Sequence, residues 1–85
     1  METTAMNEQR LARIRVMAAE HLEVDPETLT MTTDFARDCG ADSLVLMDFR
    51  AALEEEFEVT IAQQDWDDLL TLERVYQVLA DLAGW

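Results

Sequence analysis

Three stretches of this sequence place apolar residues at the three-and-four spacing of an amphipathic α-helix. The first starts near Asn7, the second runs from about Ser43 to Phe57, and the third runs from Thr71 to about Leu82. Their apolar stripes are Leu11, Ile14, Ala18 and Leu22, then Leu46, Phe49, Leu53 and Phe57, and finally Leu72, Val75, Val78, Leu79 and Leu82. Because each stripe has to be buried against another element, the pattern predicts an all-α fold.

The segments between these helices differ in length. Pro26 ends any continuation of the first helix, because the residue before a proline is pushed out of the helical region, and an irregular connection runs from Val24 to Asp42. Residues 58–61 indicate a short strand or an extended turn, and residues 64–70 indicate one or two turns of helix. We therefore expect a small four-helix bundle, with three main helices, one short helix and a long loop between helices 1 and 2. A loop of that length in a small domain is usually functional.

Length and charge limit what such a chain can do. With 85 residues it has room for one core, so we expect a single domain over residues 1–85, with the patternless residues 1–6 disordered. Nineteen acidic residues against six basic ones give a formal net charge of −13. Such a surface repels nucleic acid and anionic membranes and attracts basic protein surfaces. The hydrophobic content of 49% argues against disorder of the remaining chain.

Cysteine usage and hydropathy indicate where the protein works. Cys39 is the only cysteine, which excludes an internal disulfide and fits a reducing compartment. The first twenty residues lack the apolar core of a signal peptide, and no apolar run approaches the length of a membrane span. We expect a cytoplasmic monomer with no membrane partner.

Asp42 and Ser43 stand at the predicted start of the second helix. Gly40 frees the backbone for a tight turn, and Asp42 is a good N-cap residue. Ser43 then lies in the first helical turn, where its hydroxyl is exposed beside the positive end of the helix dipole. A phosphate esterified to this hydroxyl would be stabilised there. An ordinary capped turn needs the same residues, so these positions by themselves leave both interpretations open.

The run Gly40-Ala41-Asp42-Ser43-Leu44, followed downstream by Leu53-Glu54-Glu55-Glu56-Phe57, resembles the acyl carrier proteins. The resemblance extends from about Leu11 to Leu82. In that family the matching serine carries a 4′-phosphopantetheine arm, which a phosphopantetheinyl transferase moves from coenzyme A and whose thiol holds an acyl chain as a thioester. The resemblance implies that Ser43 is the attachment residue, that Asp42 belongs to the flanking motif, and that the chain is a carrier and not an enzyme.

The second helix also has an outward face that mixes modest apolar groups with carboxylates. With Ser43 at its head, this face indicates reversible docking of acyltransferase- or ketosynthase-type enzymes through basic residues, although a merely solvated acidic face is the alternative. The predicted docking residues are Leu44, Met47, Asp48, Ala51 and Glu55. The resemblance further implies that Ile61 plugs the core from an extended loop. It places a sheltered acyl chain between the second and last helices, against Phe49, Leu53, Ile61 and Val75.

Other site chemistries lack the residues they need. A serine hydrolase requires a base beside Ser43, but His21 is the only histidine and lies on the first helix as a surface or boundary residue. An EF-hand loop starting at Asp34 would need glycine at its sixth position and glutamate at its twelfth, whereas Gly40 is seventh and Val45 is twelfth. One histidine and one cysteine far apart cannot form a zinc site, so we expect no metal.

Several residues depart from the pattern common among fatty-acid carriers. Ile61-Ala62 replaces the usual Ile-Pro, and Leu46, Arg50 and Trp66 are unusual at their positions. These departures favour a discrete carrier of polyketide or other specialised metabolism, with primary fatty-acid synthesis as the alternative. A carrier-like adaptor or structural subunit that is no longer modified is a third interpretation, although the intact Asp42-Ser43-Leu44 argues against it.

Overall fold

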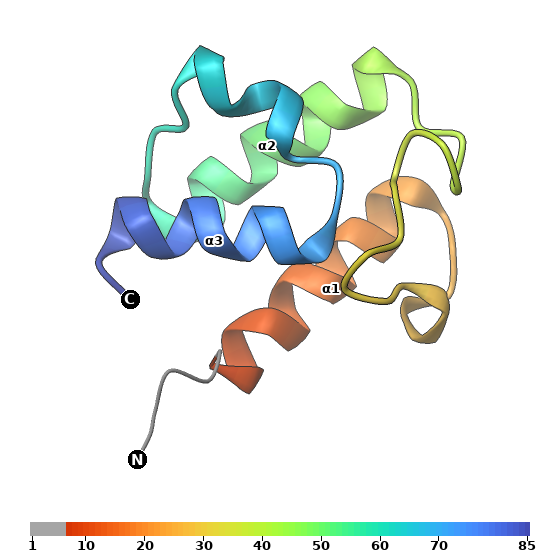
Figure 1. The fold of residues 1–85 in the computed structure, drawn as a ribbon, viewed down its shortest axis with the longest axis horizontal. Coiled ribbons are helices and arrows are strands. Elements are labelled where there is room, and N and C mark those ends of the chain that lie inside the picture. The colour runs from red at the N-terminus through yellow and green to blue at the C-terminus, as the bar shows by residue number, and fades with distance from the viewer. Residues whose placement is uncertain (1–6) are drawn as a thin grey trace.

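The computed structural model describes residues 7–85 and shows a helical fold (Figure 1). Within that range the α-helices are α1 (Glu8–Leu22), α2 (Ser43–Phe57) and α3 (Leu72–Ala83). Two 3₁₀ helices join them, η1 (Pro26–Thr28) and η2 (Gln63–Asp68). The predicted all-α bundle, with a short helix between α2 and α3, is confirmed. The predicted disorder of residues 1–6 falls outside the described residues.

Each α-helix starts where its sequence supplies a capping side chain. The N-cap residue is extended, and its side-chain oxygen accepts a hydrogen bond from the backbone N–H three residues later. The donor–acceptor distances are 3.0, 3.0 and 3.1 Å, and the bonds join Asn7 to Arg10, Asp42 to Val45 and Thr71 to Arg74. These caps are local, which explains why the helix starts agree with the sequence prediction.

The end of α1 lies ahead of Pro26 and is closed by backbone hydrogen bonds. Glu23 adopts a left-handed conformation with φ of 58°, and its N–H donates to the carbonyl of Ala19. The next N–H, that of Val24, donates to the same carbonyl at 3.1 Å. These two hydrogen bonds give the Ala19 carbonyl, in the last turn of α1, its partners before the chain reaches Pro26. Pro26 is the first residue of η1. The proline therefore prevents a restart of α1 but does not end it.

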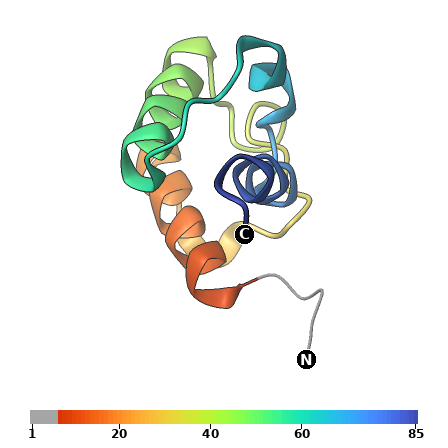
Figure 2. The same cartoon turned by 90° about the vertical axis from the view of Figure 1, so that its left-hand side faces the viewer.

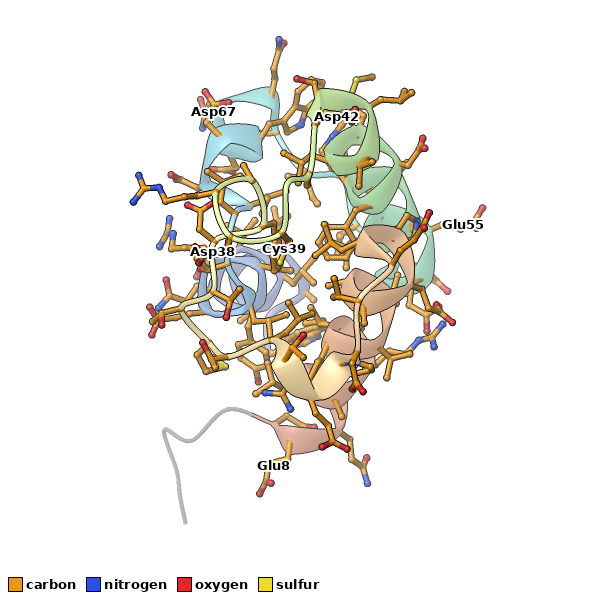
Figure 3. All side chains as sticks on the ribbon, turned by 90° about the vertical axis from the view of Figure 1, so that its right-hand side faces the viewer. Glu8, Asp38, Cys39, Asp42, Glu55 and Asp67 are labelled. Atoms are coloured by element: carbon orange, nitrogen blue, oxygen red, sulfur yellow. The ribbon has the colours of Figure 1, made fainter. Side chains whose placement is uncertain are left out.

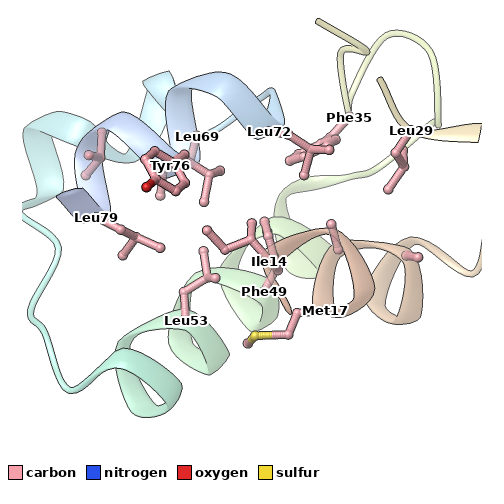
Figure 4. Close-up of a cluster of buried hydrophobic side chains, with 14 of the residues drawn as sticks. Ile14, Met17, Leu29, Phe35, Phe49, Leu53, Leu69, Leu72, Tyr76 and Leu79 are labelled. Carbon is pink, nitrogen blue, oxygen red and sulfur yellow. The ribbon is translucent and has the colours of Figure 1, made fainter. Parts of the chain in front are cut away.

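The core lies where α1 packs against both α2 and α3 (Figure 4). In Figure 2, α3 is seen nearly end-on, with α1 and α2 side by side next to it. The residues that lose all or nearly all of their exposure include Ile14, Phe35, Phe49, Leu53, Leu72, Val75 and Leu79. The predicted plug, Ile61, is also buried at 3% exposure. Apolar residues from every main helix therefore form one common core.

The predicted burial of Leu82, the last residue of the apolar stripe of α3, is wrong. Its side chain is 43% exposed. Leu82 lies in the final turn of α3, where it lines an open surface hollow together with Arg74 and Asp81. The apolar spacing of α3 includes Leu82, but among the described residues no other element of the bundle packs over this side chain.

The long loop before α2 is anchored at its centre. Phe35 is fully buried, its N–H donates to the carbonyl of Leu70 at 2.8 Å, and its own carbonyl accepts from the N–H of Ala41 at 3.0 Å. The carbonyl of Met31 accepts from the N–H of Glu73, at the start of α3, at 3.1 Å. These contacts hold the loop against the η2–α3 corner and so fix the point at which α2 begins. Within residues 7–85, none of the helices combines the length and apolar character needed to cross a bilayer.

Candidate functional site

Ser43 is the first residue of α2, and it is exposed. It is also the only serine in the sequence. The Asp42 carboxylate accepts a hydrogen bond from the N–H of Val45 at 3.0 Å. This bond stabilises the first turn of α2, to which Ser43 belongs. Gly40 has a φ of 71°, a left-handed conformation that residues with a side chain rarely adopt. The turn and the cap together present the Ser43 hydroxyl at a helix N-terminus, where a phosphate group is electrostatically favoured.

The acidic residues that precede Ser43 build the loop. Asp34 Oδ1 accepts from the N–H groups of Ala36 and Arg37 at 2.9 and 2.8 Å, and Asp38 Oδ2 accepts from the N–H of Asp34 at 2.9 Å. These carboxylates therefore stabilise turns. In the part of the chain that the structure describes, no group of three or more His, Cys, Asp or Glu residues is arranged to hold a metal ion.

Cys39 lies half-buried on this loop, packed against the edge of the core (Figure 3). Burial raises the pKa of its thiol, and the neighbouring charges of Asp38 and Asp34 raise it further. The thiol is therefore held in its neutral, less nucleophilic form.

A pocket of about 240 Å³ opens directly beside Ser43, between α2 and η2. It is lined by Ser43, Leu46, Met47, Arg50, Trp66, Asp67 and Leu69. Figure 3 shows Asp42 and Asp67 at the same end of the molecule, with Glu8 at the opposite end. The pocket therefore lies at the end of the bundle that presents the Ser43 hydroxyl. Three residues that depart from the fatty-acid carrier pattern, Leu46, Arg50 and Trp66, meet in its wall.

A closed set of contacts links two residues of the pocket wall, Arg50 and Trp66, to Ile61 and Glu54. The guanidinium of Arg50 stacks on the Trp66 ring, with Cζ 3.5 Å from the ring centroid. Trp66 Nε1–H donates to the carbonyl of Ile61 at 3.2 Å, and the N–H of Ile61 donates to Glu54 Oε2 at 2.7 Å. The other carboxylate oxygen, Glu54 Oε1, lies 4.0 Å from Arg50 Nη1 and so closes the set of contacts. These contacts fix η2 against α2.

The predicted docking residues are all exposed on α2. Leu44 is 66% exposed and Met47 is 50% exposed, a large fraction for apolar side chains. At 100° per residue the set covers about a quarter of the helix circumference, so its members share one face. The set consists of Leu44, Met47, Asp48, Ala51 and Glu55. Figure 3 shows Glu55 projecting outward from this helix.

The residues predicted to shelter an acyl chain lie elsewhere. Phe49, Leu53, Ile61 and Val75 are at most 3% exposed and belong to the closed core. The pocket beside Ser43 is lined by other residues, of which Asp67 and Leu69 had no functional role in the sequence prediction. Their position depends on where η2 lies against α2, and no local pattern encodes that placement.

Comparison with known proteins identifies the family. A family model described as a phosphopantetheine attachment site matches residues 12–79. The acyl carrier protein of Trieres chinensis is 31% identical over 74 residues, which cover 87% of this chain and 92% of the relative. That of Campylobacter jejuni subsp. doylei is 35% identical over 69 residues, covering 81% and 90% of the two chains. The chain belongs to the acyl carrier protein family.

Family membership establishes the prosthetic group. Acyl carrier proteins bear 4′-phosphopantetheine and carry acyl groups on it, as the resemblance in the sequence implied. The residues present fit this group, because the exposed serine hydroxyl at the start of α2 leaves room for an attached arm and the adjoining pocket is open to it. When attached, the arm supplies a terminal thiol that holds an acyl group as a thioester.

A solved structure adds a more specific likeness. One chain of a structure titled "The ishigamide ketosynthase/chain length factor" is 38% identical to this carrier, with a TM-score of 0.75. The match covers 93% of this chain and 100% of that one, so the two chains share the fold over nearly their whole length.

Proposed function

We propose that Ser43 carries the 4′-phosphopantetheine arm and that this carrier delivers acyl intermediates to enzymes of polyketide or other specialised metabolism in the cytoplasm. The observation that carries the proposal is the position of Ser43, exposed at the head of α2 and at the mouth of a pocket. The likeness to a chain in a ketosynthase/chain length factor structure supports the choice of pathway class. Primary fatty-acid synthesis is the alternative.

The attachment step is a phosphoryl transfer. The Ser43 oxygen attacks the phosphorus of coenzyme A that bears the pantetheine, and the pyrophosphate bond to the adenosine 3′,5′-bisphosphate group breaks. The hydroxyl proton passes to a base of the transferase, adenosine 3′,5′-bisphosphate leaves, and the product is a phosphodiester joined to Ser43. In this chain the N-terminus of α2 stabilises the added negative charge, because its N–H groups point toward the Ser43 end.

Mass spectrometry tests the attachment residue. Incubation with coenzyme A and a broad-specificity phosphopantetheinyl transferase should add one phosphopantetheine mass to the wild type. Ser43→Ala should fold and gain nothing, whereas Thr60→Ala, a control in an exposed loop, should be modified fully. A wild type that stays unmodified across several transferases would instead support the unmodified adaptor. The intact mass of protein isolated from its own cells, with the thioester preserved, would identify the cargo and decide between the two pathways.

We further propose that the exposed face of α2 is where partner enzymes dock. Leu44 and Met47 expose apolar surface next to Ser43, and Asp48 and Glu55 add negative charge along the same face. A ketosynthase-type partner with basic residues at its entrance would meet these carboxylates as the arm enters its active site. Exposed ion pairs contribute about 0.2–1 kcal/mol each, so removal of a single carboxylate should have little effect.

A double charge reversal tests this surface. Asp48→Lys with Glu55→Lys should slow acyl transfer markedly, because attraction becomes repulsion, and should remove most of the salt dependence of the rate. The matched control is Glu73→Lys with Asp81→Lys on α3, which changes the net charge equally. Equal losses from the two pairs would show that overall charge, and not the α2 face, directs the partner.

The same geometry supports a path for the acyl chain. An acyl chain packed against Phe49, Leu53, Ile61 and Val75 would require the closed core to open between α2 and α3. The pocket beside Ser43 is already open, and it starts at the attachment residue. We therefore propose the pocket as the first part of the path of the chain, with the core residues as its deeper end.

A further inference from the structure

Arg50 is an unusual residue to find in the wall of an acyl-chain pocket. Its side chain is only 15% exposed. Among the described residues its one ion contact is Glu54, at 4.0 Å from Nη1, a distance beyond hydrogen-bond length. The other oxygen of Glu54 already accepts the N–H of Ile61 at 2.7 Å. A guanidinium has five N–H donors, so Arg50 retains donor capacity at the pocket that it lines.

The guanidinium is also held in a defined orientation. It stacks on the Trp66 ring at 3.5 Å, and Trp66 is itself fixed by the hydrogen bond from its indole N–H to Ile61. Arg50 therefore cannot turn freely to find another acceptor. Apolar groups of Leu46, Met47 and Leu69 line the rest of the pocket, together with the carboxylate of Asp67. The site thus combines an apolar channel with an oriented donor on its wall.

We propose that Arg50 makes the pocket beside Ser43 selective for acyl chains that carry a keto oxygen in addition to the thioester carbonyl, such as 3-oxoacyl chains, over saturated chains of equal length. This inference rests on the proposed attachment at Ser43. A saturated chain entering the pocket would displace water from the Arg50 donors without replacing its hydrogen bonds, whereas a keto oxygen accepts one of them. A chain ending in a carboxylate fits less well, because Asp67 and Glu54 place negative charge nearby.

The geometry allows a tethered chain to reach Arg50. Arg50 follows Ser43 by two turns of α2, which is about 10 Å along the helix axis. An arm attached at Ser43 has to fold back along the helix to bring the chain into the pocket. The keto oxygen then lies at the wall formed by the Arg50–Trp66 stack, and the apolar part of the chain contacts Leu46 and Leu69. A site built to hydrogen-bond one group discriminates strongly against analogues that lack it.

Nuclear magnetic resonance of the loaded carrier tests the inference directly. Ser43 is loaded with a hydrolysis-stable octanoyl or 3-oxooctanoyl group on the arm, and the indole N–H signal of Trp66 is followed. Trp85, which packs against Phe57 and Tyr76, serves as the internal reference. We expect the 3-oxooctanoyl form to shift the Trp66 signal strongly and the octanoyl form to shift it weakly. This difference corresponds to a preference for the pocket of about tenfold, the size of one hydrogen bond to a partly buried charged donor.

Substitution of Arg50 should remove the preference. Arg50→Met keeps an unbranched stem but loses every donor, so both chains should shift Trp66 to the same degree. Arg50→Lys keeps the charge and loses the planar stack, so it should retain part of the preference and provides a second test if the Met variant unfolds. The matched control is Arg74→Met, which removes an exposed arginine paired with Asp68 outside this pocket and should leave the preference unchanged.

Three results would overturn the inference. Equal shifts from the two chains in the wild type would show no selectivity, and an unchanged preference in Arg50→Met would assign it to other residues. A full Trp66 shift from the arm without an acyl group would show that the pocket binds the arm instead. Failure of the underlying attachment is a separate outcome, because it appears beforehand as the absence of any added mass on the wild-type protein.

Discussion

Glu54 connects α2 to the segment that leads into η2, and its removal should destabilise the fold measurably. Its carboxylate accepts the N–H of Ile61 at 2.7 Å and lies 4.0 Å from the Arg50 guanidinium. Ile61 is only 3% exposed, so water cannot easily take the place of the carboxylate. The side chain of Glu54 therefore determines whether this buried N–H has a hydrogen-bond partner.

The magnitude follows from these contacts. Glu54→Ala leaves the Ile61 N–H unpaired, which costs about 1–3 kcal/mol of unfolding free energy, and the weak ion pair with Arg50 adds at most about 1 kcal/mol. Glu54→Gln keeps an acceptor but loses the charge, so its cost should be about 1 kcal/mol. For a domain of this size, each kcal/mol corresponds to a fall in Tm of roughly 4–8 °C.

Thermal and urea unfolding, followed by circular dichroism, measure both variants. Glu55→Ala is the matched control, because Glu55 is the next residue on the same helix, is exposed, and should change stability by no more than about 0.5 kcal/mol. The expected order of stability is wild type, then Glu54→Gln, then Glu54→Ala. If Glu54→Ala were as stable as Glu55→Ala, the contact with Ile61 would not stabilise the fold and the reasoning would be wrong.

Three further predictions concern the cap, the thiol and the charge. Asp42→Ala removes the N-cap bond to Val45 and should cost about 1 kcal/mol in urea unfolding, whereas Asp42→Asn keeps an acceptor and should cost less; equal losses would contradict a capping role. Because burial, Asp38 and Asp34 raise the pKa of the Cys39 thiol, iodoacetamide should alkylate the folded chain with a pH midpoint above that of the denatured chain. By the same shift, stability should be retained below the thiol pKa of the unfolded chain and lost as the pH rises through the folded value, and identical midpoints would refute this. Added salt should raise the Tm, since it screens repulsion within a chain of net charge −13, and a Tm insensitive to salt would count against that repulsion.

The sequence determined those features whose cause is local. The helical period of the apolar residues sets which segments are helices, and a capping side chain within three residues sets where each helix begins. That Ser43 lies in the first turn of α2 follows from the Asp42 cap, whereas the place of this turn in the fold depends on the contacts of the preceding loop. For this reason the fold class, the start of each helix and the exposed serine could all be predicted without coordinates.

The tertiary structure decided what depends on contacts between distant segments. Arg50 and Trp66 are separated by an irregular loop, and their stacking requires the bonds from Ile61 to Glu54 and to Trp66 that fold η2 onto α2. The exposure of Leu82 likewise depends on where the bundle stops covering α3. The apolar spacing within one helix shows which of its faces is buried, but it does not show where the neighbouring elements lie. The pocket beside Ser43 could therefore be located only once α2 and η2 were placed against each other.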